Sequence, residues 1–261
     1  GGRITGKQGA YSIGVLDIRT GDVASGGVPA TNFGVVRVKR DILRRSAVGF
    51  IVTDRSVTPQ AAGHGQSYGV DGVFSFFQNL NINTYLAATD NPGVSGRNTS
   101  YRAQLDYNAD RYGVQLERLA TDRNFNPQVG FMSRTSFIRN TVYTRFSPRM
   151  KGSAVRKWIY DAQLDYITNP SGRLQSRALK AGWRAELQNS DTFAVEGARS
   201  FESFDTPYTV SPGVVLPVGT YHFGEVRAFY NFGPQRPVSA NVELDHGQFY
   251  NGHRTCLLYT S

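Results

Sequence analysis

Apolar and polar residues alternate strictly through long segments of this chain, and this pattern is its strongest constraint on fold. Leu179, Ala181 and Trp183 alternate with charged or small residues, as do Tyr101 and Ala103 earlier in the chain. Successive side chains of a β-strand point to opposite faces, so each such segment predicts a strand with one dry and one wet face. No segment of ten or more residues keeps a convincing 3.6-residue period, which predicts an all-β protein.

The alternation predicts about 14 strands joined as an antiparallel up-and-down meander. Soluble strands average about 5–6 residues, whereas tilted transmembrane strands need about 9–11. Most of the predicted strands have the greater length, which favours an outer-membrane-type β-barrel. The predicted spans are 2–7, 10–20, 33–43, 46–56, 65–77, 80–89, 100–109, 111–121, 135–147, 154–168, 173–189, 192–203, 220–232 and 237–250.

The predicted connections also differ in length. Longer loops are expected at 21–32, 57–64, 90–99, 122–134 and 204–219, and short turns near 7–9, 44–46, 78–79, 110–111, 169–172, 189–191 and 233–236. Short turns at one end of a sheet and longer loops at the other are typical of outer-membrane barrels.

Composition narrows the alternatives. No apolar run reaches the roughly 18–20 residues of a transmembrane helix, so membrane insertion would require a closed barrel. The net charge of +9 comes from basic residues dispersed over the predicted strands, which does not favour nucleic acid as a partner. One cysteine excludes an intrachain disulfide framework and a cysteine-rich zinc site.

Both ends of the chain suggest a fragment. The first residues already have the pattern of a strand, without a signal peptide before them. Near the other end, Cys256, Leu257 and Leu258 interrupt the alternation and resemble translated sequencing-adapter read-through. We therefore expect one barrel-like domain over 1–252, truncated at both ends and incomplete as a barrel, and a non-native adapter-derived tail over 253–261.

Basic side chains on strand faces are the first candidate contacts. Arg139 and Arg145 share one face of a predicted strand, and Arg37 and Lys39 share a face of another. They could form a ladder in the barrel lumen that attracts anions, or contact anionic lipid of the outer leaflet. Alternatively, they belong to a hydrated face where carboxylates pair with them.

The loop over 122–134 is the second candidate. It is rich in asparagine and proline but also carries aromatic residues. Folded inward, it would constrict the barrel; alternatively it is a packed turn that seals one end. Its candidate constriction residues are Asn124, Phe125, Asn126, Pro127 and Phe131.

Catalytic and metal chemistry have weak support. The four histidines lack the spacing of metal ligands, and no G-x-S-x-G nucleophile motif occurs. Asp161 and Asp165 share a strand face, as a glycosidase pair could, but a hydrated face explains them as well. We predict no catalytic residue, metal or cofactor; a hydrolase would need acidic residues clustered with His64 or His222.

Several segments resemble a known family: Ile4-Thr5-Gly6-Lys7 with Tyr11-Ser12-Ile13-Gly14, Asn32–Val38, Arg40–Ser46, Asn79–Asn83 and Asn124–Phe131. Together, over most of residues 2–252, they resemble the uncharacterised DUF5916 domain, which usually follows a family-9-like carbohydrate-binding module in bacterial envelope proteins. The resemblance implies a barrel-like outer-membrane domain, with neither an established activity nor catalytic residues to carry over.

We therefore expect a domain of the bacterial outer membrane that serves for anchoring or for substrate capture and passage, linked to carbohydrate through an upstream module. Its expected partners are outer-membrane lipid or lipopolysaccharide and carbohydrate, not nucleic acid, and its oligomeric state is left open. The alternative is a secreted soluble β-protein that binds or hydrolyses polysaccharide. Such a protein would have polar residues on both sheet faces and aromatic residues such as Trp158 and Trp183 in a cleft.

Overall fold

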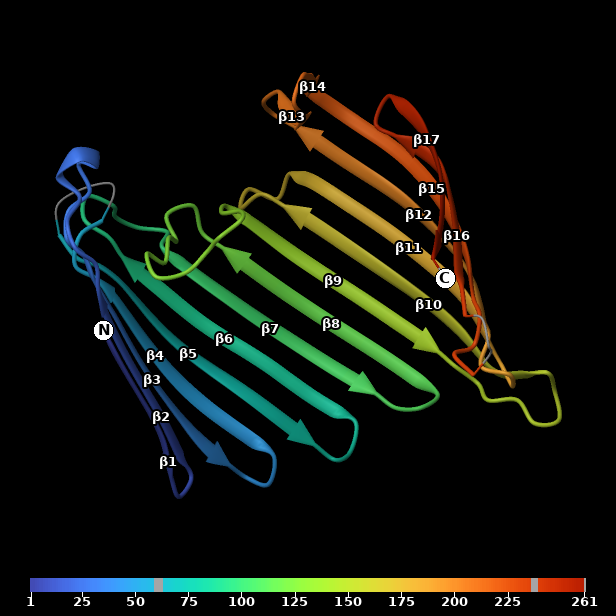
Figure 1. Cartoon of the computed structure of the whole chain (residues 1–261), viewed down its shortest axis with the longest axis horizontal. Helices are drawn as coiled ribbons and strands as arrows, with labels where there is room; N and C mark the ends of the chain where they lie inside the picture. The colour runs from blue at the N-terminus through green and yellow to red at the C-terminus, as the bar shows by residue number, and fades with distance from the viewer. Residues whose placement is uncertain (59–62, 236–238, 261) are drawn as a thin grey trace. The chain divides into compact units, whose positions relative to one another are not determined.

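The computed structural model describes residues 1–58, 63–235 and 239–260. These residues form an antiparallel meander of 15 strands in one open sheet, with β1 and β17 as its edge strands (Figure 1). A separate hairpin, β13–β14, and a short 3-10 helix, η1 (Ala24–Gly26), lie in two of the connections. The described residues contain no α-helix, and therefore no helix long and apolar enough to span a membrane.

The strands are long and follow one another along the chain. Their bounds are β1 (Gly2–Gln8), β2 (Tyr11–Arg19), β3 (Asn32–Ile42), β4 (Ser46–Arg55), β5 (Gly65–Phe76), β6 (Leu80–Asp90), β7 (Thr99–Asn108), β8 (Tyr112–Thr121), β9 (Phe137–Phe146), β10 (Val155–Thr168), β11 (Leu174–Leu187), β12 (Thr192–Phe204), β13 (Tyr208–Ser211), β14 (Val214–Leu216), β15 (Gly219–Asn231), β16 (Asn241–Phe249) and β17 (Gly252–Thr260).

The predicted all-β meander is confirmed, since each predicted span overlaps a strand of the sheet. Parts of four predicted segments lie outside the described residues. They are 237 and 238 of the last predicted strand, 59–62 of a predicted loop, 236 of a predicted turn and 261 of the predicted tail. Two features were not predicted: β13–β14 lies within the expected loop 204–219, and β17 pairs with β16 where the tail was expected. The non-native origin of that tail stays a prediction.

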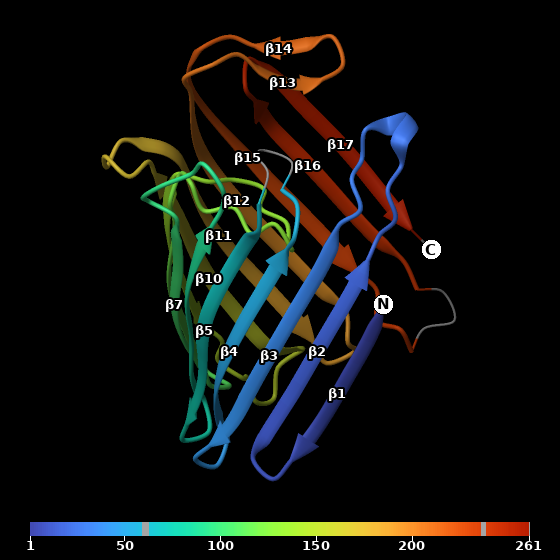
Figure 2. The same cartoon turned by 90° about the vertical axis from the view of Figure 1, so that its left-hand side faces the viewer.

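Two compact units divide the chain. The first comprises Gly1–Asp106 with Glu117–Ile138, and the second comprises Tyr107–Leu116 with Arg139–Ser261. In the first unit, consecutive strands from β1 to β6 lie side by side, with tight turns at one end and longer connections at the other (Figure 2). This difference agrees with the loop lengths predicted from the sequence.

One face of the first unit is apolar and uncovered. Cross-strand register aligns Ile13 with Val38, Val38 with Phe50, Phe50 with Val70, and Val70 with Leu86. Directly paired side chains project to the same side, so these residues form one row. Phe50, Val70 and Leu86 remain 44%, 50% and 54% exposed. We call this surface the apolar face of the first unit and the opposite side its polar face.

The second unit has the same two-sided arrangement. Register aligns Tyr160 with Trp183, Trp183 with Val195, and Val195 with Ala228 on one side, which we call its apolar face. On the opposite side, its polar face, register aligns Asp161 with Gly182, Gly182 with Glu196, Glu196 with Arg227 and Arg227 with Asp245.

Burial is inverted relative to a water-soluble domain. The largest fully buried side chains of the described residues are all polar: Thr89, Thr121, Asp191, Ser100 and Ser147. Many valine, leucine and aromatic side chains are meanwhile exposed. Water-soluble proteins normally bury such apolar residues. The sheet therefore leaves much of its apolar surface uncovered, whereas many of its polar side chains are buried.

Candidate functional site on the polar faces

The polar face of the first unit carries an ion pair that spans three strands. The Arg37 guanidinium of β3 donates two hydrogen bonds to the Asp71 carboxylate of β5, one of them with Nη2 2.8 Å from Oδ2. Gly49 of β4 lies between them: a Cβ there would be 2.6 Å from Nη2 of Arg37. Glycine thus provides the space for the pair. Lys39, the second predicted residue, lies on the same face beside Gly49.

The predicted constriction loop packs against the polar face of the first unit. The Asn126 backbone amide donates to Oγ1 of Thr89 at 3.3 Å, and Nδ2 of Asn91 donates to the Asn126 carbonyl at 2.9 Å. Phe125 is buried, whereas Phe131 is 87% exposed. The segment around Asn126 is therefore fastened to the end of β6.

Two further contacts hold this loop. Nδ2 of Asn124 donates to the carbonyls of Ser95 and Gly96 at 3.1 and 2.8 Å. Nη1 of Arg55 donates to Oε1 of Gln128 at 3.4 Å. Pro127 lies between these anchored residues in the chain. Five hydrogen bonds thus hold residues 124–128 against the ends of β4 and β6 and the neighbouring loop, an arrangement that fits either a constriction or a packed turn that seals one end.

The predicted arginines of β9 lie on the polar face of the second unit. Thr141, between Arg139 and Arg145 on that face, donates to Oδ1 of Asp165 at 2.6 Å. Nη2 of Arg145 donates to Oδ1 of Asn108 at 2.9 Å, and its guanidinium also donates to the Ala109 and Asp110 carbonyls. Arg145 therefore holds the β7–β8 turn in place.

That turn carries a second basic contact. Nε and Nη2 of Arg149 donate to the two Asp110 carboxylate oxygens at 2.7 and 2.8 Å, and Nζ of Lys157 donates to Oδ1 at 3.4 Å. These hydrogen bonds, that from Arg149 foremost, hold the pKa of the Asp110 carboxyl well below its ordinary value. The ion pair of Arg149 with Asp110 thus connects the β7–β8 turn to the segment that follows β9.

Asp110→Asn should remove an acid-sensitive part of the stability. Because the folded-state pKa of Asp110 is depressed, its contribution is complete above the ordinary carboxyl pKa of about 4 and is lost as pH falls below it. We expect the wild type to be the more stable at neutral pH, with the difference shrinking below about pH 4. Urea unfolding of both proteins across this range checks it; a difference independent of pH would contradict it.

An aromatic cluster occupies one end of the polar face of the second unit, beside the connection that holds β13–β14. The rings of Phe204 and Tyr208 stack with centroids 5.0 Å apart, and Tyr250 contacts Tyr221 and Phe223 at 5.6 and 5.1 Å. Phe249 joins the group at 4.8 Å from Tyr250.

Burial in this cluster raises the pKa of the Tyr250 phenol, which lies in the β16–β17 turn, so its hydroxyl stays protonated at neutral pH. The hydroxyl of Tyr221 donates to the Pro217 carbonyl at 2.9 Å. The cluster thus combines aromatic rings, those of Tyr208 and Phe249 exposed, with phenolic hydroxyls. We call these six residues, Phe204, Tyr208, Tyr221, Phe223, Phe249 and Tyr250, the aromatic cluster; the alternation pattern marked some of them as strand residues but not their convergence.

Residues considered for catalysis are dispersed. Nδ1 of His64 lies 3.1 Å from the Asp54 carboxylate, whereas His222 lies in a pocket of the second unit whose lining contains no carboxylate. Asp165 accepts from Thr141 and Gln163 on the polar face. Within the described part of the chain, no three His, Cys, Asp or Glu side chains converge as metal ligands.

Comparisons with known proteins add no relative: no family model, curated protein or solved structure matches this chain. The resemblance to the DUF5916 domain therefore stays a prediction from the quoted segments.

Proposed function

We propose that this chain is a β-barrel domain of a bacterial outer membrane that anchors the protein and captures or passes carbohydrate. The inverted burial carries the proposal, because exposed apolar faces and packed polar side chains suit a lipid exterior and a hydrated interior. The edge strands β1 and β17 need hydrogen-bonding partners in lipid, so the proposal includes closure of the sheet.

The uncovered apolar faces of the two units support contact with an apolar environment outside the chain. A second layer of structure normally covers the apolar side of a sheet. Lipid would provide that cover here.

Aromatic residues on the apolar face of the second unit also support membrane insertion. Ring centroids lie 5.4 Å apart for Tyr112 and Phe146, 5.3 Å for Trp158 and Trp183, and 5.6 Å for Trp183 and Phe193. These residues lie toward the strand ends that meet the β7–β8 and β11–β12 turns. Aromatic side chains favour this level, where membrane meets water.

Cell fractionation with heat-modifiable gel mobility tests the membrane location. We expect the protein in the outer-membrane fraction, released only by detergent, with a folded form that migrates differently from the boiled form. A protein found wholly in the soluble fraction without detergent would contradict the proposal and favour the secreted alternative.

The aromatic cluster is our candidate for carbohydrate capture, because the apolar C–H faces of sugar rings pack on aromatic rings. We expect Tyr221→Ala or Tyr250→Ala to weaken oligosaccharide binding roughly tenfold, about the effect of one lost ring contact. Titration calorimetry with xylan and β-glucan oligosaccharides measures this. Tyr221→Phe, which keeps the ring, should retain most of the affinity; equal losses for both Tyr221 variants would contradict ring stacking.

A further inference from the structure

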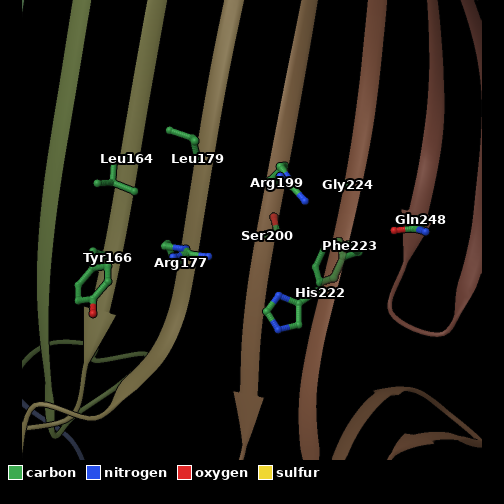
Figure 3. A pocket seen from close by; sticks show the side chains of 10 residues that line it. All are labelled: Leu164, Tyr166, Arg177, Leu179, Arg199, Ser200, His222, Phe223, Gly224 and Gln248. Carbon is green, nitrogen blue, oxygen red and sulfur yellow. The ribbon is translucent and has the colours of Figure 1, made fainter.

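A shallow pocket of about 640 Å³ opens among five strands of the second unit (Figure 3). Cross-strand register places one row of its lining on the apolar face. The row consists of Leu164, Leu179, Arg199 and Gly224, on the neighbouring strands β10, β11, β12 and β15. A parallel row on the same face contains Tyr166, Arg177, Phe201 and His222. Basic groups thus stand within an otherwise apolar surface.

The two guanidiniums of this pocket have no acidic partner. Arg177 and Arg199 are exposed, and neither forms a salt bridge or side-chain hydrogen bond with any residue that the structure describes. On the polar face of the same unit, Nε of Arg227 lies 3.0 Å from Oδ1 of Asp245. On a face in contact with lipid, as proposed, such unpaired charges would be stabilised by a counter-ion from outside the chain.

The surroundings define that counter-ion. Arg199 lies between Leu179 and Gly224, and the absence of a side chain at Gly224 deepens the pocket beside the guanidinium. Guanidinium groups bind phosphate through paired hydrogen bonds. The adjacent leucine surface suits an acyl chain.

The position along the strands agrees with a lipid headgroup. Arg177 is near the start of β11 and His222 near the start of β15, so both lie toward the end of the sheet that holds the β12–β15 connection. His222 packs against Phe201 at 4.9 Å between ring centroids. Farther along the same face lie Trp183, Val195 and Val226, so basic groups border an apolar band.

We propose that Arg177, Arg199 and His222 bind the phosphate of a membrane lipid with a net negative charge, whose headgroup carries no cation and whose acyl chains lie along the apolar face. This inference rests on the proposed membrane location. The chain would recognise this ligand by its anionic phosphate and its apolar tail, and the two guanidinium groups would make the main contacts with the phosphate.

Native mass spectrometry of the full chain in detergent, with phosphatidylglycerol or phosphatidylcholine added, tests the site. The wild type should retain phosphatidylglycerol preferentially, and Arg177→Gln/Arg199→Gln should lower its retention by about tenfold or more, as expected for lost charge-assisted hydrogen bonds. Lys180→Gln/Lys151→Gln removes the same charge elsewhere and should retain the lipid. If the double variant does not fold, Arg177→Gln and Arg199→Gln are measured singly, and each should also lower phosphatidylglycerol retention.

Equal retention of the two lipids by the wild type, or equal loss in both double variants, would overturn the lipid site. Displacement of phosphatidylglycerol by inorganic phosphate at matched concentration would also overturn it, by indicating a site for free phosphate. The fractionation experiment is independent: a soluble wild type would contradict the membrane location, whereas membrane-bound protein without lipid preference would contradict this site alone.

Discussion

Val70→Arg is expected to destabilise the proposed membrane-inserted fold by about 2–4 kcal/mol, the cost of a basic side chain on a lipid-facing surface near the middle of a bilayer. Val70 pairs with Phe50 on one side and Leu86 on the other, at the centre of the apolar face of the first unit. Its side chain is 50% exposed, so arginine would fit without a steric clash. Urea unfolding in phospholipid vesicles measures the loss, together with heat-modifiable mobility.

Asn83→Arg provides the matched control. Asn83 belongs to β6 and pairs with Val73, which projects to the polar face of the first unit. An added arginine there would project to the side that the proposal leaves hydrated, beside Val73, so we expect a change within about 0.5 kcal/mol. If Val70→Arg were equally mild, the apolar face would be in contact with water, and the lipid-facing assignment would be wrong.

Most of the meander could be predicted because its signal is local. Alternation in segments such as that from Leu179 to Trp183 depends only on neighbouring residues, and these segments became strands of the sheet. The same pattern placed Arg139 and Arg145, and likewise Arg37 and Lys39, on shared faces. It could not distinguish a lipid-facing side from the core of a sandwich, because both are apolar.

The contacts of the candidate sites depend on distant parts of the chain. Arg37 and Asp71 are 34 residues apart, and their pair requires register as well as the missing side chain of Gly49. The aromatic cluster similarly joins residues of β12, β15 and the β16–β17 turn. Alternation specifies the face of each residue but not its cross-strand neighbour, which is why the ion pair and the cluster were not predicted.

Asp191→Ala is expected to destabilise the fold by about 3 kcal/mol, since it would leave the buried Gly233 amide and the half-buried Tyr230 hydroxyl without their acceptor. Asp191 lies in the β11–β12 turn and is 1% exposed. Its carboxylate accepts from the Tyr230 hydroxyl and the Gly233 amide, both at 2.7 Å, and from Nδ2 of Asn189 at 2.9 Å. The side chain thus joins this turn to the connection after β15.

Asp205→Ala is the control for Asp191→Ala, because it removes a carboxylate that is exposed instead of buried. Asp205 pairs with Arg173 at 2.7 Å, but the two side chains are 56% and 59% exposed. Exposed pairs contribute at most about 1 kcal/mol, so this variant should unfold near the wild-type urea concentration. Equal destabilisation by both variants would mean that the Asp191 network contributes no more than a surface ion pair. A large loss for Asp191→Ala alone would identify the buried carboxylate as the link between the two connections.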